Sequence, residues 1–182
     1  MNANALTDVQ SPASAAELAD MLGVEDTDTL LQPMLEAATD ALEGYLNSAI
    51  VSRQFKAYFD RWPITGAVMT GLSGTLAHYD AYVELPYTRL ISVDSVEAGG
   101  EPLTGFDTAN TNPAKLYLSA YSGDLTVTYT AGFDVVPSAI KTAVLYVASF
   151  MYEHRGSCDA DDALLRSGAA GLVSRYRVEL GY

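Results

Sequence analysis

Few residues in this sequence are of the types that carry out acid–base, nucleophilic or metal chemistry. It has two histidines, His78 and His154, and one cysteine, Cys158. These are too few soft ligands for a zinc site, and no G-x-S-x-G turn accompanies either histidine as a triad base. The acidic run 159–162 lacks the glycine and the closing glutamate of a calcium loop and is typical of an acidic loop or helix cap. We therefore expect no catalytic residue, no metal and no cofactor, and we do not predict an enzyme.

Charge is distributed unevenly along the chain. The sequence has 10 basic and 23 acidic residues, for a net charge of −13, and no Lys or Arg precedes Arg53. A surface that grips nucleic acid needs cations to neutralise phosphates, so this distribution argues against DNA binding. The acidic surface either keeps the protein soluble or lets DNA pass without sticking, and charge alone leaves both readings open.

Hydropathy gives no indication of a membrane protein. No segment reaches the roughly 20 apolar residues of a membrane helix. The first 14 residues lack the basic region and apolar core of a secretion signal. A single cysteine fits a reducing compartment. We expect assembly in the cytoplasm and no membrane partner.

Two helices are predicted within residues 14–50. Ser14 and Glu17 have the spacing of a capping box at the start of the first helix. Apolar residues at helical spacing indicate a longer helix from Thr27 or Asp28 to about Asn47. Its acidic outer face, opposite the apolar stripe, consists of Glu36, Asp40 and Glu43.

Residues 51–130 change to a period of two, which is typical of strands. The clearest alternation runs from Leu125 to Thr130, and a phase slip near Ser95 and Val96 suggests a bulge. A Gly- and Thr-rich stretch from Pro63 to Leu76 is interpreted as a loop or flexible hairpin. Together these segments predict one small, mostly antiparallel sheet.

The segment that follows Pro137 is predicted to be a long apolar helix. Proline fits the first position of a helix, and apolar residues cover nearly the whole circumference up to Tyr152. Such a helix either runs through the centre of the domain or meets another subunit. The candidate interface residues are Ile140, Val144, Val147, Phe150, Met151, Tyr152 and Arg155.

The C-terminal segment alternates again. After a Gly/Ala-rich hinge at 167–171, residues 172–182 are predicted to be extended and suited to pairing with a sheet edge, the chain's own or a partner's. The fold class is therefore α+β, in one domain covering 1–182. Its parts are a mobile arm (1–13), a helical part (14–50), an inserted β-rich part (51–130), the long helix (137–156), and a hinge and tail (157–182).

Read in order, several segments resemble the phage head–tail connector (adaptor) family of long-tailed phages and phage-like particles. The strongest is VTYTAGFDVVPSAIKTAVLYVASFMYEHRG, from Val127 to Gly156, with its Tyr-x-Ala-Gly-aromatic turn, Val-Pro helix start and Arg-Gly ending. DTLLQPMLEAATDALEGYLNSAIV, ELPYTRLISVDSV and LVSRYRVE are similar to the family's opening helix, middle strand and tail. His154 stands where the family commonly has Asn, and the tail runs past the usual Tyr-Arg.

The resemblance implies a structural subunit of the virion neck. It implies a ring of copies, commonly about twelve, between the portal protein and a tail-side stopper or tail-terminator protein. The genome would pass through its channel without specific binding, and assembly would occur in the bacterial cytoplasm. The portal-binding tail would comprise Leu172, Arg175, Tyr176, Arg177 and Val178. The channel-lining candidates are Glu36, Asp40 and Glu43.

Three alternatives remain open from the sequence. The first is another neck or tail-completion protein. The second is a small acidic enzyme that uses a carboxylate pair. The third is a monomeric binding module in which the apolar helix is simply core.

Overall fold

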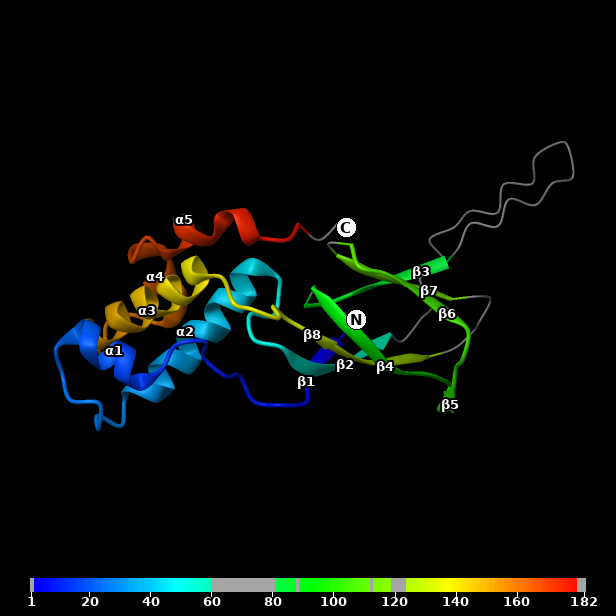
Figure 1. Ribbon diagram of the computed structural model, residues 1–182, viewed down its shortest axis with the longest axis horizontal. Coiled ribbons are helices and arrows are strands. Elements are labelled where there is room, and N and C mark those ends of the chain that lie inside the picture. The colour runs from blue at the N-terminus through cyan, green and yellow to red at the C-terminus, as the bar shows by residue number, and fades with distance from the viewer. Residues whose placement is uncertain (1, 60–80, 88, 112, 119–123, 180–182) are drawn as a thin grey trace, which may run out of the picture.

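The computed structural model describes residues 2–59, 81–87, 89–111, 113–118 and 124–179. It has a mixed α+β fold, with helices at one end and two antiparallel sheets at the other (Figure 1). The loop expected from Pro63 to Leu76 lies outside the described residues. In the described ranges, no helix combines the length and the apolar composition needed to cross a bilayer.

The helical layer contains α1 (Ala15–Leu22), α2 (Leu31–Leu46), α3 (Ser138–Glu153), α4 (Ala160–Arg166) and α5 (Ala169–Val173). The predicted capping box is confirmed, since Ser14 N–H donates to Glu17 and Glu17 N–H donates to Ser14 Oγ. Helix α2 begins at Leu31, later than expected. Asp28 accepts a hydrogen bond from Leu30 N–H in the turn before it, and Leu30 itself provides no side-chain cap.

The strands form two sheets, where the sequence analysis expected one. The five-stranded sheet has the order β1-β2-β8-β4-β5, and the three-stranded sheet has the order β3-β7-β6. Their bounds are β1 (Asn2–Ala5), β2 (Arg53–Phe59), β3 (Ala81–Leu85), β4 (Leu90–Ala98), β5 (Glu101–Pro102), β6 (Phe106–Ala109), β7 (Ala114–Leu118) and β8 (Leu125–Ala131). Strand alternation reveals which faces are buried, but it does not say which strands pair.

Two local features of the five-stranded sheet bear on the predictions. The bulge expected near Ser95 is confirmed by register shifts between Leu90 and Ser92 and between Val93 and Ser95. The prediction of a mobile arm is wrong for residues 2–5, which pair antiparallel with β2 as the edge strand β1. An open sheet edge has unpaired backbone N–H and C=O groups, and β1 forms hydrogen bonds with part of those on β2.

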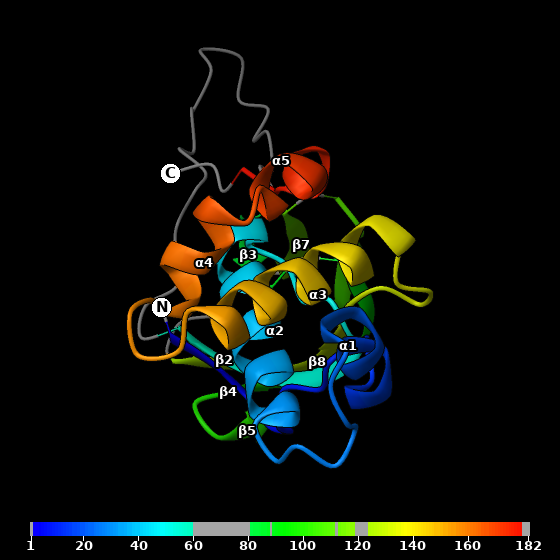
Figure 2. The same ribbon diagram turned by 90° about the vertical axis from the view of Figure 1, so that its left-hand side faces the viewer.

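Two hydrophobic cores result. In the helical core, α3 packs against α1, α2, α4 and α5 (Figure 2). The sandwich core lies between the two sheets, with inward side chains such as Phe55, Val83, Leu116 and Tyr129. Each core is built from the apolar face of its own elements, so the joint between them needs separate interactions.

This joint, which we call the seam, consists of residues 50–53 and 131–133. Phe133 N–H donates to Ile50 C=O at 3.2 Å. Gly132 has φ +140°, and a Cβ atom there would lie 2.6 Å from the backbone N and Cα of Ser52. Only glycine allows the two chain segments to approach this closely.

Candidate assembly surfaces

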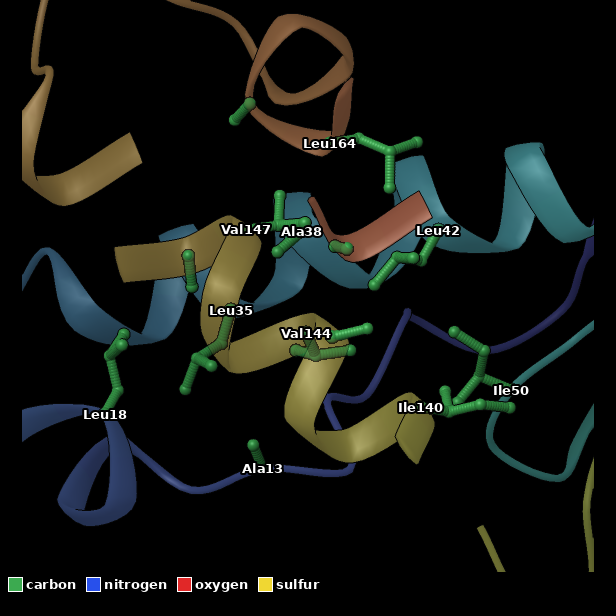
Figure 3. Close-up of a cluster of buried hydrophobic side chains, with 14 of the residues drawn as sticks. Ala13, Leu18, Leu35, Ala38, Leu42, Ile50, Ile140, Val144, Val147 and Leu164 are labelled. Atoms are coloured by element: carbon green, nitrogen blue, oxygen red, sulfur yellow. The ribbon is translucent and has the colours of Figure 1, made fainter. Parts of the chain in front are cut away.

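Three of the seven predicted interface residues lie inside the chain's own core. Ile140, Val144 and Val147 are fully buried in the helical core, where Ile140 lies beside Ile50 (Figure 3). The expectation that these three side chains meet another subunit is therefore wrong, because α1, α2, α4 and α5 already surround this side of the helix. Phe150 and Met151 are half-buried against the same core.

The last two predicted interface residues lie at the C-terminal end of α3 and bind their own chain. Tyr152 O–H donates to Asp28 Oδ2 at 2.7 Å, and Arg155 lies 4.0 Å from the centre of the Tyr152 ring. Hydrogen bonds from Leu30 N–H and then from Tyr152 lower the pKa of Asp28, and the bond to Asp28 raises the pKa of Tyr152. Arg155 remains exposed at this end of α3.

The acidic face predicted for α2 is only partly a surface. Glu36 and Asp40 are exposed, but Glu43 is buried, with a side-chain exposure of 1%. Its carboxylate accepts hydrogen bonds from Ile50 N–H at 2.8 Å and from both terminal nitrogens of Arg53 at 3.2 and 2.5 Å. Burial raises the pKa of Glu43, and the bonds from Ile50 and Arg53 oppose the rise. Glu43 therefore cannot line a channel, and it instead ties α2 to β2 across the seam.

The predicted extended tail is wrong for residues 172–176. Residues Ala169–Val173 form α5, and Ser174–Tyr176 form a 3-10 turn. Val178 is buried, its N–H donates to Leu46 C=O at 2.9 Å, and its C=O accepts from Asn47 Nδ2 at 3.0 Å. Val178 is thus fixed to the end of α2 and cannot contact a partner without leaving the core, whereas Leu172 is 43% exposed.

Tyr176 packs where the tail meets the seam. Its ring meets the Phe133 ring edge to face at 6.1 Å between centroids. The Arg89 guanidinium lies 3.9 Å from the centre of the Phe133 ring, and its Nη2 is 3.4 Å from Tyr176 C=O. Burial lowers the pKa of Arg89. Arg89 could not be predicted as part of this site, because nothing local in the sequence connects it with a tail 87 residues away.

Two further arginines flank Tyr176 in the chain. Arg175 donates to Tyr176 O–H at 2.6 Å, and Arg177 lies 5.2 Å from the centre of the Tyr45 ring. Both arginines are exposed. We call Arg89, Arg175 and Arg177 the arginine cluster.

The described residues provide little for catalysis. Among them, no group of three or more His, Cys, Asp or Glu side chains could hold a metal ion. A hollow of about 220 Å³ lies between the N-terminal arm and β2, lined by Thr7, Asp8, Gln10 and residues 51–54. Arg53, the one cation among the described residues that line the hollow, already forms an ion pair with Glu43. The hollow therefore offers no evident acid–base pair.

Comparison with known proteins identifies the fold. No family model matches the chain, and no curated protein matches it. Solved structures do match over 100% of this chain and 98% of theirs. One is a chain in the neck of an empty gene transfer agent (GTA) particle computed with C6 symmetry, at TM-score 0.73 and 23% identity. Chains in the neck of the native particle computed with C12 symmetry and in its virion have a TM-score of 0.71, at 23% and 21% identity. The chain shares its complete fold with these virion components.

Proposed function

We propose that this protein is a structural neck subunit of a phage-like particle. More specifically, it is a head–tail adaptor that forms a ring between the portal and the tail-side proteins, with a channel for the genome. The observation that carries the proposal is the end-to-end fold similarity to chains in necks computed with C6 and C12 symmetry. The order of sequence segments that resembles the adaptor family supports it independently.

The surface of the helical layer supports a role in assembly. Tyr146 on α3 and Leu165 on α4 are 40% and 69% exposed. Large apolar side chains at a surface are available for protein contacts, although single ones are common on monomers. A ring built from identical head-to-tail contacts needs two different faces on each copy, and the helical layer and the sandwich give this molecule dissimilar ends.

For the portal contact, we propose the exposed face of α5 around Leu172. The simplest test would be truncation after Gly171, which removes the whole predicted portal-binding tail. That truncation would also remove Val173 and Val178, which are buried, so the remaining chain would lose part of its core. A single exposed side chain is a cleaner target.

The test mixes the purified chain with portal protein and follows rings by electron microscopy and light scattering. We expect rings on portal with the wild-type chain and weakened portal binding with Leu172→Glu, because a charge would enter an apolar contact. Ile91→Glu is the matched control, since Ile91 is also exposed, at 51%, but lies on β4 in the sandwich. Absence of any complex with portal would reject the adaptor. Equal binding by both variants and the wild type would reject only the assignment of α5.

A further inference from the structure

The arginine cluster has unused capacity for binding anions. The chain has only 10 basic residues; two of them, Arg89 and Arg175, bind Tyr176, and Arg177 is the next residue along the chain. Within the described part of the chain, the ion pairs are Arg53–Glu43, Lys141–Glu17 and Arg166–Asp162, so none involves the cluster. Arg175 and Arg177 are exposed, so their guanidinium groups are open to a partner. Guanidinium groups are the side chains best suited to bind carboxylates through two hydrogen bonds, so the cluster fits an acidic partner.

The outer face of α2 is the complementary surface on the same chain. Glu36 and Asp40, which we call the acidic stripe, are exposed one helical turn apart. Gln32 donates a hydrogen bond to Glu36 at 2.8 Å, which holds that carboxylate against the helix. No described cation forms an ion pair with either carboxylate.

A single copy cannot join these two surfaces. Arg177 lies beside Tyr45, which follows Asp40 by five residues and Glu36 by nine. At about 100° of rotation per residue, Tyr45 is about 140° to 180° around α2 from the acidic stripe. The cluster and the stripe therefore lie on different sides of the helix, as two faces of a head-to-tail contact must.

We propose that the arginine cluster of one copy receives the acidic stripe of the next copy. This inference rests on the proposed ring and names the charged groups that decide how neighbouring copies are oriented in it. It also assigns Glu36 and Asp40 to a contact between copies and not to the wall of a channel. In a chain of net charge −13, copies repel one another, so a local contact of opposite charge decides which faces meet.

A charge exchange tests the contact. One variant carries Arg175→Glu and Arg177→Glu, and the other carries Glu36→Arg and Asp40→Arg. Each variant alone brings like charges together at every contact, so we expect assembly to weaken about tenfold or more. In an equimolar mixture, the glutamates at 175 and 177 of the first variant can meet the arginines at 36 and 40 of the second. The unchanged arginine cluster of the second variant can meet the unchanged acidic stripe of the first. A ring in which the two variants alternate therefore has opposite charges at every contact. Assembly is measured by sedimentation velocity and electron microscopy, alone and on portal protein, after circular dichroism has shown that each variant folds.

Each outcome of the exchange decides the proposal. Recovery in the mixture but in neither separate variant supports it. Full assembly of either variant alone overturns it while leaving the adaptor ring intact. A mixture that assembles no better than its components also overturns it, and if the first variant has then lost portal binding, the arginines serve the portal. A wild-type chain that forms no ring even with portal overturns both the contact and the proposed function.

Discussion

The helical layer and the β-sandwich are stabilised in different ways. In the helical layer, α3 contacts each of α1, α2, α4 and α5, and its inward side chains are buried from several directions. In the sandwich, the core is a single layer of alternating side chains between two sheets. The first core depends on one central element, whereas the second spreads its burial over many short strands.

The two cores meet through polar groups and close backbone contact. The buried pair Glu43–Arg53 and the close approach at Gly132 join them, and the tail covers the joint through Tyr176. Removing one partner of a buried ion pair leaves an uncompensated charge, so such a joint is sensitive to single changes. The stability of each half and the coupling of the halves can therefore be altered separately.

The largest effect is expected from Glu43→Ala. It leaves the Arg53 guanidinium and Ile50 N–H without their acceptor, so the free energy of unfolding should fall by about 3–5 kcal/mol. Chemical denaturation followed by circular dichroism measures the loss, and backbone amide NMR signals of the helices and of the strands report whether the two halves unfold together. We expect the two transitions to separate. The control Glu36→Ala, at an exposed site on the same helix, should change stability by less than about 0.5 kcal/mol. Coincident transitions at wild-type stability would show that the pair does not join the cores.

A loss of about 3 kcal/mol is expected from Gly132→Ala, because the new Cβ would clash with the Ser52 backbone and strain a positive φ angle. The matched control is Gly44→Ala in α2, where a Cβ meets no heavy atom within 4 Å. That control should stabilise the protein by up to about 1 kcal/mol. Thermal unfolding of both variants measures the contrast, and equal melting temperatures would contradict a tight seam.

The smallest effect concerns the outer face of the five-stranded sheet. Partial burial acts to raise the pKa of Asp94, but hydrogen bonds from Gln54, Ser92 and Thr130 outweigh it and lower the pKa below the ordinary 3.8. A lowered folded-state pKa means that the stabilisation is present above pH 3.8 and is lost as the pH falls through the folded value. Asp94→Asn should therefore cost less than about 1 kcal/mol at pH 7.

The difference between Asp94→Asn and the wild type should shrink in denaturation curves recorded at progressively lower pH, below 3.8. Asp107→Asn, an exposed site on β6, is the control and should show little difference at any pH. A constant difference for Asp94→Asn across the pH range would exclude a contribution from its ionised form.

Local features of the fold could be predicted where short-range chemistry decides the structure. The Ser14–Glu17 capping box and the helix start after Pro137 involve residues within one turn of each other. The alternation from Leu125 to Thr130 has the same local origin, since side chains of a strand point to opposite faces. The division into two sheets could not be predicted in this way, because pairing joins strands that are far apart in the sequence.

The candidate site was harder to predict than the fold. Glu43 was assigned to an exposed face because its burial depends on Arg53 and on a backbone N–H beyond the helix. The tail 172–182 was predicted to be extended from alternation alone, and the stretch 167–171 before it was predicted to be a hinge, although Ala169 and Ala170 favour a helix. Arg89 reaches the tail only through the folded seam. In each case a long-range contact overrides the local pattern.

The attachment of Val178 has a mechanical consequence. Its two backbone hydrogen bonds run to Leu46 and Asn47, at the C-terminal end of α2. A force applied to the chain at Glu179 would thus act first on α2 and the helical layer. The sandwich would carry load only after the two hydrogen bonds of Val178 had broken. Tension on the C-terminal segment is consequently transmitted to the helical layer before it reaches the sandwich.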